Sequence, residues 1–136
     1  MIKLLLADDH QNMRKVISEI LKNDAEVLLI GEASSFRVVI ELSSERRPDV
    51  VLMDVHMGDE QTIKLSDLKS SLVDCQLLAM SLWTDEETKA LAKSLGAVTL
   101  LDKANLASEL LPSLKLCAQR RSARNHVNQQ IQAIPD

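Results

Sequence analysis

Residues 48–57 read PDVVLMDVHM, and this segment places four consecutive apolar residues between two aspartates. A short apolar run without polar alternation is typical of a strand that helices cover on both faces of a parallel sheet. We therefore predict a buried strand over residues 49–53. Pro48 marks the end of the preceding helix, and Asp54 stands where the strand ends.

Similar apolar runs alternate with amphipathic stretches on both sides of this segment. The expected strands are residues 2–7, 26–31, 49–53, 76–81 and 98–101, and the expected helices are residues 11–22, 37–45, 62–72, 85–95 and a fifth from about 105 to 117. Alternation of strands and helices predicts βα units around one parallel sheet. The fold class is therefore α/β, with a doubly wound five-stranded sheet and five helices.

Local signals define several helix ends. Thr84 and Asp85 are natural N-caps of the fourth helix, and Gly96 follows it as a stop. Asn105 is expected to cap the fifth helix, and Pro112 to kink it. In the third helix we expect four side chains to face inward: Ile63, Leu65, Leu68 and Leu72.

Composition limits the classes of protein that fit. A chain of 136 residues with 46% hydrophobic and 1% aromatic residues suits one domain with an aliphatic core. The net charge of -4 argues against a nucleic-acid surface on this domain. No apolar run approaches the roughly 20 residues that cross a bilayer, so we expect a cytoplasmic protein with no membrane contact. Cys75 and Cys117 are expected to be packing residues.

The composition changes after Cys117, where the chain becomes rich in Gln, Asn and Arg. We predict a folded domain over residues 1–118, followed by a polar C-terminal tail or linker over residues 119–136. Two interpretations stay open for the second part, which is either a solvated terminus or a linker to an output domain.

Polar residues follow the predicted strands at their carboxyl ends, which meet at one edge of a parallel sheet. They are Asp8 and Asp9 after the first strand, Asp54 after the third, Ser81 after the fourth, and Asp102 and Lys103 after the fifth. Each alone fits a turn or a helix cap, but their joint placement predicts one site. Neighbouring carboxylates repel by roughly 4 kcal/mol per pair at 4 Å, so we expect a divalent cation such as Mg²⁺ and the Lys103 ammonium to compensate. Asp54 is then the candidate nucleophile for a phosphoryl group.

These motifs resemble the receiver domain of two-component response regulators, over residues 2 to about 117. The matching segments are LLLADDH, PDVVLMDVHM, LLAMS and LGAVTLLDK, and the layout is most similar to receivers that precede a helix-turn-helix output domain. The resemblance implies a flavodoxin-like fold with strand order 2-1-3-4-5, and two helices on one face against three on the other.

The resemblance also implies a function and a set of roles. Asp54 would accept phosphate from the phosphohistidine of a histidine kinase or a phosphotransfer protein, Lys103 would bind the phosphoryl group, and Ser81 would be the switch hydroxyl. Mg²⁺, or Mn²⁺ in its place, would contact Asp9, Asp54 and the His56 carbonyl, with Asp8 holding a bound water. The output would be a changed partner contact or a homodimer through the fourth helix, fifth strand and fifth helix, in transcriptional control. DNA would be reached only through an output domain absent from this chain.

Several positions depart from the family pattern. Gly58 and Thr62 replace a proline and a glycine after the acceptor, Leu100 replaces an aromatic switch residue, and Ala104 replaces a proline after Lys103. A cis bond before alanine would cost about 2.5–4 kcal/mol, so we expect it to be trans. His56 and Trp83 either lie over the site or are loop and packing residues. His10 is expected to cap or flank the first helix, and the alternative is that it tunes the acids.

Other classes of function fit less well. A phosphorylation-independent interaction module is the main alternative, because the departures leave the acids in place but alter the relay. A metal-dependent phosphatase would need a second acid two positions after the nucleophile, where His56 stands. A dinucleotide enzyme would need a glycine-rich loop after the first strand. The leading prediction is a regulator that promotes its own phosphorylation and dephosphorylation without being an enzyme of other substrates.

Overall fold

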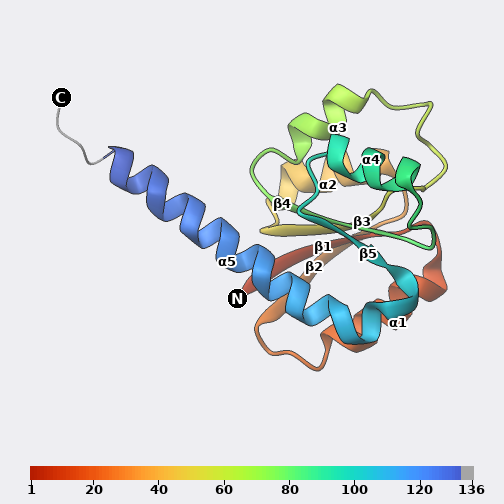
Figure 1. Ribbon diagram of the computed structural model, residues 1–136, viewed down its shortest axis with the longest axis horizontal. Coiled ribbons are helices and arrows are strands. Elements are labelled where there is room, and N and C mark those ends of the chain that lie inside the picture. The colour runs from red at the N-terminus through yellow and green to blue at the C-terminus, as the bar shows by residue number, and fades with distance from the viewer. Residues whose placement is uncertain (133–136) are drawn as a thin grey trace.

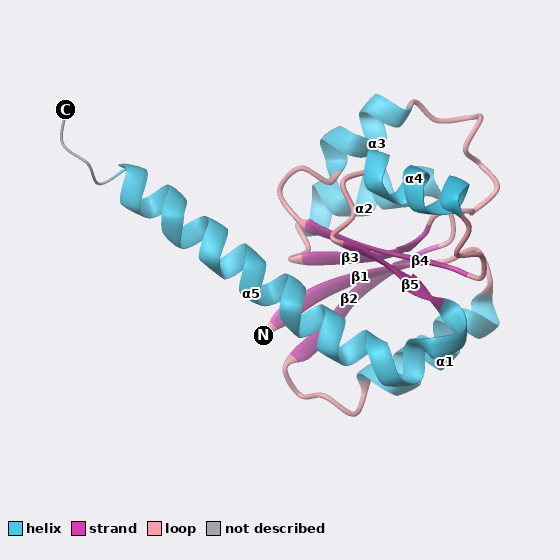
Figure 2. Ribbon diagram, viewed as in Figure 1, coloured by secondary structure: helices cyan, strands magenta, loops and turns pink. Residues whose placement is uncertain are grey.

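The computed structural model describes the fold of residues 1–132 and the side chains of residues 1–120. Five parallel strands form one sheet in the order β2-β1-β3-β4-β5 (Figures 1 and 2). The strands are β1 (Ile2–Ala7), β2 (Val27–Ala33), β3 (Val50–Asp54), β4 (Gln76–Ser81) and β5 (Thr99–Asp102). The helices are α1 (Gln11–Leu21), α2 (Phe36–Arg46), α3 (Leu65–Ser71), α4 (Glu86–Ser94) and α5 (Leu106–Gln132). The predicted fold class and strand order are confirmed.

Helices cover both faces of the sheet, which is why most residues of its strands are apolar. Alternate side chains of β1 point to opposite faces, so that Leu4 and Leu6 pack with α1 and α5, while Leu5 and Ala7 pack with α2, α3 and α4. Two helices therefore cover one face of the sheet and three cover the other, as expected. Each fully buried leucine contributes roughly 1.5–3 kcal/mol to folding, so the core needs few aromatic residues. Phe36 is buried in it, whereas Trp83 is 58% exposed.

The third helix differs from its prediction. It begins at Leu65 and not at residue 62. Thr62 instead closes a turn, because its amide and its hydroxyl both donate to the carbonyl oxygen of Asp59, at 3.0 and 2.9 Å. The prediction that Leu65 faces inward is wrong, since this side chain is 46% exposed in the first turn of the helix.

The start of α5 also corrects a prediction. Asn105 is not its cap but the last residue of a short 3₁₀ turn, Lys103–Asn105, and the side chain of Asp102 caps that turn by accepting from the Ala104 amide at 2.9 Å. Asp85 caps α4 as predicted, accepting from the Thr88 amide at 2.8 Å. The peptide bond before Ala104 is trans, because the described residues contain no cis bond.

Helix α5 continues through Pro112 and past residue 118 as far as Gln132, and in Figure 1 it extends away from the sheet. The division into a domain of residues 1–118 and a tail of residues 119–136 stays a prediction, and so does the kink at Pro112. Residues 133–136 of the predicted tail lie outside the described residues.

Cys117 packs in the core and Cys75 is half-buried, and both are free thiols. Within residues 1–132, no helix combines the length and the apolar character that a bilayer crossing requires.

Candidate functional site

The strand register brings the predicted site residues to one edge of the sheet. Ala7 pairs with Met53, Asp54 pairs with Met80, and Ser81 pairs with Asp102. Since these strands are parallel neighbours, their carboxyl ends lie next to one another. The polar residues that end or follow β1, β3, β4 and β5 therefore gather in one place, as the sequence predicted.

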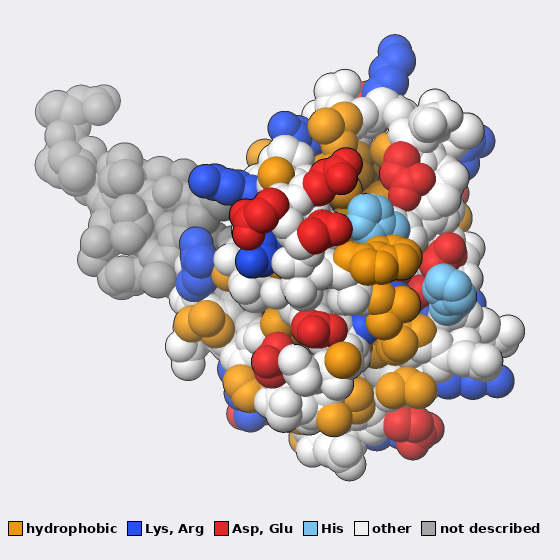
Figure 3. All heavy atoms as spheres, turned by 45° about the vertical axis from the view of Figure 1, so that its right-hand side comes forward, with side chains coloured by type: hydrophobic (Ala, Val, Ile, Leu, Met, Phe, Trp, Pro, Cys, Tyr) orange, Lys and Arg blue, Asp and Glu red, His pale blue; other side chains and the backbone are white. Residues whose placement is uncertain are grey.

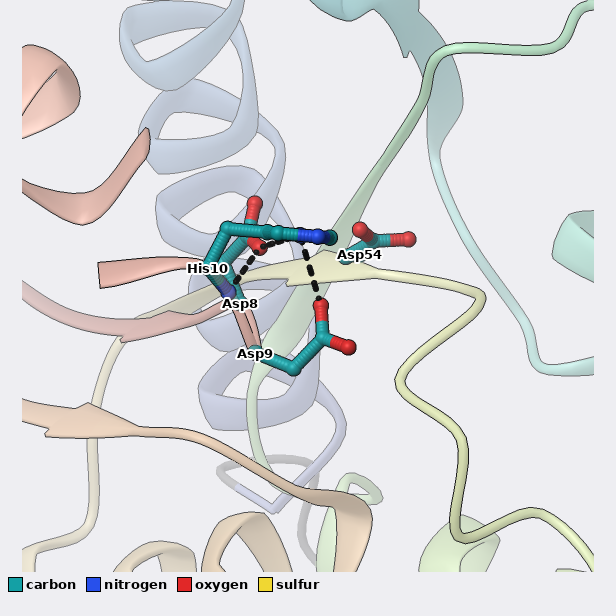
Figure 4. A group of neighbouring side chains, drawn as sticks. All are labelled: Asp8, Asp9, His10 and Asp54. Atoms are coloured by element: carbon teal, nitrogen blue, oxygen red, sulfur yellow. Dashed lines mark hydrogen bonds and ion pairs between the residues drawn. The ribbon is translucent and has the colours of Figure 1, made fainter. Parts of the chain in front are cut away.

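Four side chains at this edge form an oxygen-rich cluster (Figure 4). Asp8, Asp9, His10 and Asp54 each offer one ligand atom, and these atoms lie within 4.8 Å of one another. Asp8 is fully buried and Asp54 is 5% exposed, whereas Asp9 and His10 are exposed. The cluster thus has a buried floor formed by two carboxylates and an open side.

His10 both precedes the first helix, as predicted, and contacts the acids of the cluster, which was the alternative prediction. It is the N-cap residue of α1, but its side chain makes no cap hydrogen bond. Its Nδ1 lies 2.9 Å from Asp9 Oδ1 and 3.4 Å from Asp8 Oδ1. In the sequence, the signal for this contact was the position of His10 directly after two acids. That position alone did not determine the direction of the His10 ring.

Lys103 is a buried lysine that contacts two acids at once. Its Nζ lies 2.5 Å from Asp54 Oδ2 and 2.7 Å from Asp8 Oδ2, and the residue is only 7% exposed. The second oxygen of each acid accepts from a backbone amide two residues further on, Asp54 Oδ1 from His56 at 2.8 Å and Asp8 Oδ1 from His10 at 2.9 Å. Both carboxylates are therefore held in fixed orientations.

The pKa values follow from burial and from this ion pairing. Burial raises the pKa of Asp54 above its ordinary value, more than the hydrogen bonds from Lys103 and from the His56 amide lower it, and the charge of Asp8 raises it further. Burial acts to lower the pKa of Lys103, but its hydrogen bonds with Asp54 and Asp8 hold that pKa above its ordinary value. One ammonium thus faces two buried carboxylates.

This arrangement predicts a pH-dependent difference in stability between the wild type and Asp54→Asn in metal-free buffer. Because Asp54 holds its proton more tightly in the folded state, the wild type loses stability as pH rises from the ordinary aspartate pKa, about 3.9, through the raised value. Asparagine does not ionise, so the variant should gain melting temperature relative to the wild type over that range. Thermal unfolding at a series of pH values measures this, and a difference that does not change with pH would refute it.

Ser81 lies buried at the end of β4, and its Oγ accepts from the Trp83 amide at 3.0 Å. The His56 ring packs edge-on against the Trp83 ring with centroids 5.5 Å apart, and its Nε2 lies 3.4 Å from Thr88 Oγ1 on α4. These contacts place the His56 ring beside Trp83 and α4, and its predicted position over the acceptor stays a prediction. Figure 3 shows hydrophobic side chains next to histidines on one face of the molecule. Leu82 and Trp83, which follow Ser81 in the chain, are exposed.

The donor set fits a hard divalent cation. Carboxylate and carbonyl oxygens are the ligands that Mg²⁺ prefers, usually with one or two protein carboxylates and several waters. Asp8, Asp9 and Asp54 supply such oxygens beside a single ammonium, and Asp9 lies on the open side where a hydrated ion can enter. The residues present could therefore hold Mg²⁺ or Mn²⁺.

The fold and this site define a flavodoxin-like α/β domain with an acidic, lysine-bearing site at the carboxyl edge of its sheet. A family model for the response regulator receiver domain matches residues 4–115, so the chain belongs to this family. This assignment favours the receiver interpretation over a phosphatase or a dinucleotide enzyme. Receivers of this family act in two-component systems, and the resemblance seen in the sequence is confirmed.

Individual relatives agree with the assignment. The chain is 32% identical over 123 residues to the DNA-binding transcriptional activator DevR/DosR of Mycobacterium tuberculosis, which covers 90% of this chain and 57% of that protein. It is also 32% identical over 135 residues to a protein-glutamate methylesterase/protein-glutamine glutaminase of Syntrophomonas wolfei, covering 90% of this chain and 38% of that protein. The chain thus spans about half the length, or less, of these curated relatives.

Solved structures share the fold. The receiver domain of NarL from Mycobacterium tuberculosis superimposes with a TM-score of 0.76 at 22% identity, covering 87% of this chain and 96% of that one. The response regulator domain of CheB from Thermotoga maritima gives a TM-score of 0.75 at 22% identity, covering 88% and 97%. At this identity the likeness shows the fold alone.

Proposed function

We propose that this domain is a phosphoryl-accepting signalling switch whose acceptor is Asp54. The observation that carries the proposal is the position of Asp54, which is buried at the strand edge, contacts the Lys103 ammonium and lies close to the carboxylates of Asp8 and Asp9. The donor would be a phosphohistidine of a histidine kinase or a phosphotransfer protein.

The transfer is a displacement at phosphorus. A carboxylate oxygen of Asp54 attacks the phosphorus, the bond from phosphorus to the histidine nitrogen breaks, and its electron pair leaves with the nitrogen, giving an aspartyl phosphate and a free imidazole. Lys103 already contacts Asp54 Oδ2, so its ammonium is placed to follow the charge onto the phosphoryl oxygens.

Asp9, Asp54 and the His56 backbone carbonyl would hold Mg²⁺, or Mn²⁺ in its place, and Asp8 would hold a water bound to it. A bound Mg²⁺ supplies positive charge that neutralises the phosphoryl oxygens. Its charge also favours the ionised form of Asp54, which the nucleophile requires, against the raised pKa of that group.

Ser81 would report the phosphoryl group. Its Oγ accepts from the Trp83 amide, which leaves the hydroxyl proton available for a phosphoryl oxygen. A shift of Ser81 towards that oxygen weakens the bond to Trp83 and disturbs the Trp83–His56 contact at the start of α4. Leu100 has no polar group or aromatic ring with which to take part.

The output surface would comprise α4, β5 and α5, used for homodimerisation or for a partner. The sequence relatives named as transcriptional regulators are longer than this chain, so an output domain that follows the receiver would carry any DNA contact. We propose a cytoplasmic protein in transcriptional control, which promotes its own phosphorylation and dephosphorylation.

Incubation with Mg²⁺ and a small acyl phosphate tests the proposal. One phosphate should add to the protein, as measured by intact mass, and chelation of the metal should suppress the addition. An unmodified wild type under these conditions would contradict the proposal.

Leu100 and the altered loop after Asp54 favour one second candidate, an interaction module that binds its partner equally well with and without metal and phosphate.

A further inference from the structure

The loop of residues 55–64, between β3 and α3, has a backbone at position 58 that the usual family proline could not form. Gly58 has φ +93°, which L side chains rarely adopt, although a Cβ at this position would meet no other atom within 4 Å. A proline would require φ near -65°. The glycine is therefore needed for the backbone conformation and not for space.

Asp59 ties this loop to the start of a distant helix. Its Oδ1 accepts from the Phe36 amide at 3.0 Å, and its Oδ2 accepts from the Arg37 amide at 3.1 Å. These are the first two residues of α2, whose amides have no partner within the helix. A carboxylate at this position gains both from charged hydrogen bonds and from the helix dipole.

The same aspartate also holds the loop internally. Its carbonyl oxygen accepts from the amide and the hydroxyl of Thr62, so the threonine that replaces a family glycine closes the turn. Gly58, Asp59 and Thr62 form what we call the loop anchor. Gly58 and Thr62 are departures from the family pattern, and Asp59 supplies the hydrogen bonds to α2.

The loop anchor follows His56 closely in the chain, since Asp59 is three residues after it. Met57, which lies between them, is buried in the core with 5% exposure. The His56 amide donates to Asp54 Oδ1 at 2.8 Å. We infer that Asp59 is a positioning residue for the acceptor site: by fixing the loop on α2, it holds His56 where its amide orients Asp54. The part that concerns Mg²⁺ rests on the proposed function, in which the His56 carbonyl is a ligand.

Ser35→Ala provides a matched control for Asp59→Ala. The Ser35 side chain caps the same end of α2, accepting from the Val38 amide at 3.2 Å, and this bond lies within the helix end and not in the loop. Both variants remove side-chain caps from one helix end, a loss of similar kind for stability. Only Asp59→Ala releases the loop, so the comparison separates positioning from capping.

Amide hydrogen exchange in metal-free buffer is the first measurement. Relative to Ser35→Ala, Asp59→Ala should speed exchange of the His56 amide by about 10-fold, because local opening of the loop becomes easier. Asp59→Asn keeps one acceptor oxygen and should restore part of the protection. Equal His56 exchange in Asp59→Ala and Ser35→Ala would overturn the inference.

The second measurement is a Mg²⁺ titration of the same variants by calorimetry. Asp59→Ala should bind Mg²⁺ about 10-fold more weakly than Ser35→Ala, a typical effect of residues that orient metal ligands. Equal affinities would count against the positioning role. If the wild type itself bound no Mg²⁺, the proposed function would fail, and the exchange of the His56 amide would still decide the role of Asp59.

Discussion

Replacing Asp54 with asparagine is expected to abolish phosphate incorporation from a small acyl phosphate. The amide of asparagine has no anionic oxygen with which to attack phosphorus, and Asp54 is the acid that contacts the Lys103 ammonium without being fully buried. Asp8 also contacts Lys103, but it is fully buried. Intact mass and phosphopeptide mapping check both the loss and the site.

Asp49→Asn is the matched control for this variant. Asp49 precedes the same strand at its opposite end, where its Oδ2 accepts from the Lys3 amide at 2.8 Å. The control has the same change of charge near β3 and should incorporate one phosphate as the wild type does. Phosphate that persists in Asp54→Asn, or that maps to Asp8 or Asp9 in the wild type, would show that Asp54 is not the acceptor.

Replacing Lys103 with methionine is expected to lower both stability and phosphate incorporation. Methionine keeps much of the apolar stem but leaves Asp8 and Asp54 buried without a counter-charge, and breaking a buried ion pair in this way costs about 3–5 kcal/mol. Loss of one charge-stabilising group slows transfer by about 10²-fold or more. Urea unfolding and the rate of phosphate incorporation measure the two effects.

The pH dependence of the stability of Lys103→Met distinguishes loss of the counter-charge from a simple packing defect. The pKa of Lys103 is above its ordinary value, so the charged lysine stabilises the wild type at neutral pH, and this contribution is lost only when pH rises through that pKa. In Lys103→Met the deficit should shrink on acidification, because the unpaired acids become protonated. Lys93→Met, an exposed position on α4, should stay within about 0.5 kcal/mol of the wild type. A deficit that is equal at all pH values would indicate lost packing.

The fold and the convergence of Asp8, Asp54 and Lys103 could be predicted because both depend on short, local patterns. The run from Val50 to Met53 identifies a buried strand by its lack of alternation, and parallel pairing then carries Asp8, Asp54 and Lys103 to one edge. Strand ends bring residues together without any knowledge of side-chain conformation. This is why an acidic site opposite one lysine follows from the sequence.

Features that depend on contacts between distant segments could not be predicted. The sequence around Thr62 suits a helix start, but a hydrogen bond to Asp59 fixes a turn there instead. Asp59 is itself held by backbone amides of α2, more than 20 residues earlier in the chain. Likewise, the direction of the His56 ring depends on where α4 places Thr88 and where the chain places Trp83. Local propensity carries no information on such contacts.

Mg²⁺ titration of the wild type and of Asp9→Asn tests most directly whether Asp8, Asp9 and Asp54 form a binding site for Mg²⁺ opposite Lys103. Lys103 pairs with the other two acids, so replacing Asp9 removes a proposed ligand while the buried pairs remain. Calorimetry, together with the emission of the single tryptophan Trp83, should show one ion bound by the wild type and about 10-fold or weaker affinity in the variant. A wild type that binds no Mg²⁺, or a variant that binds it equally well, would contradict the account.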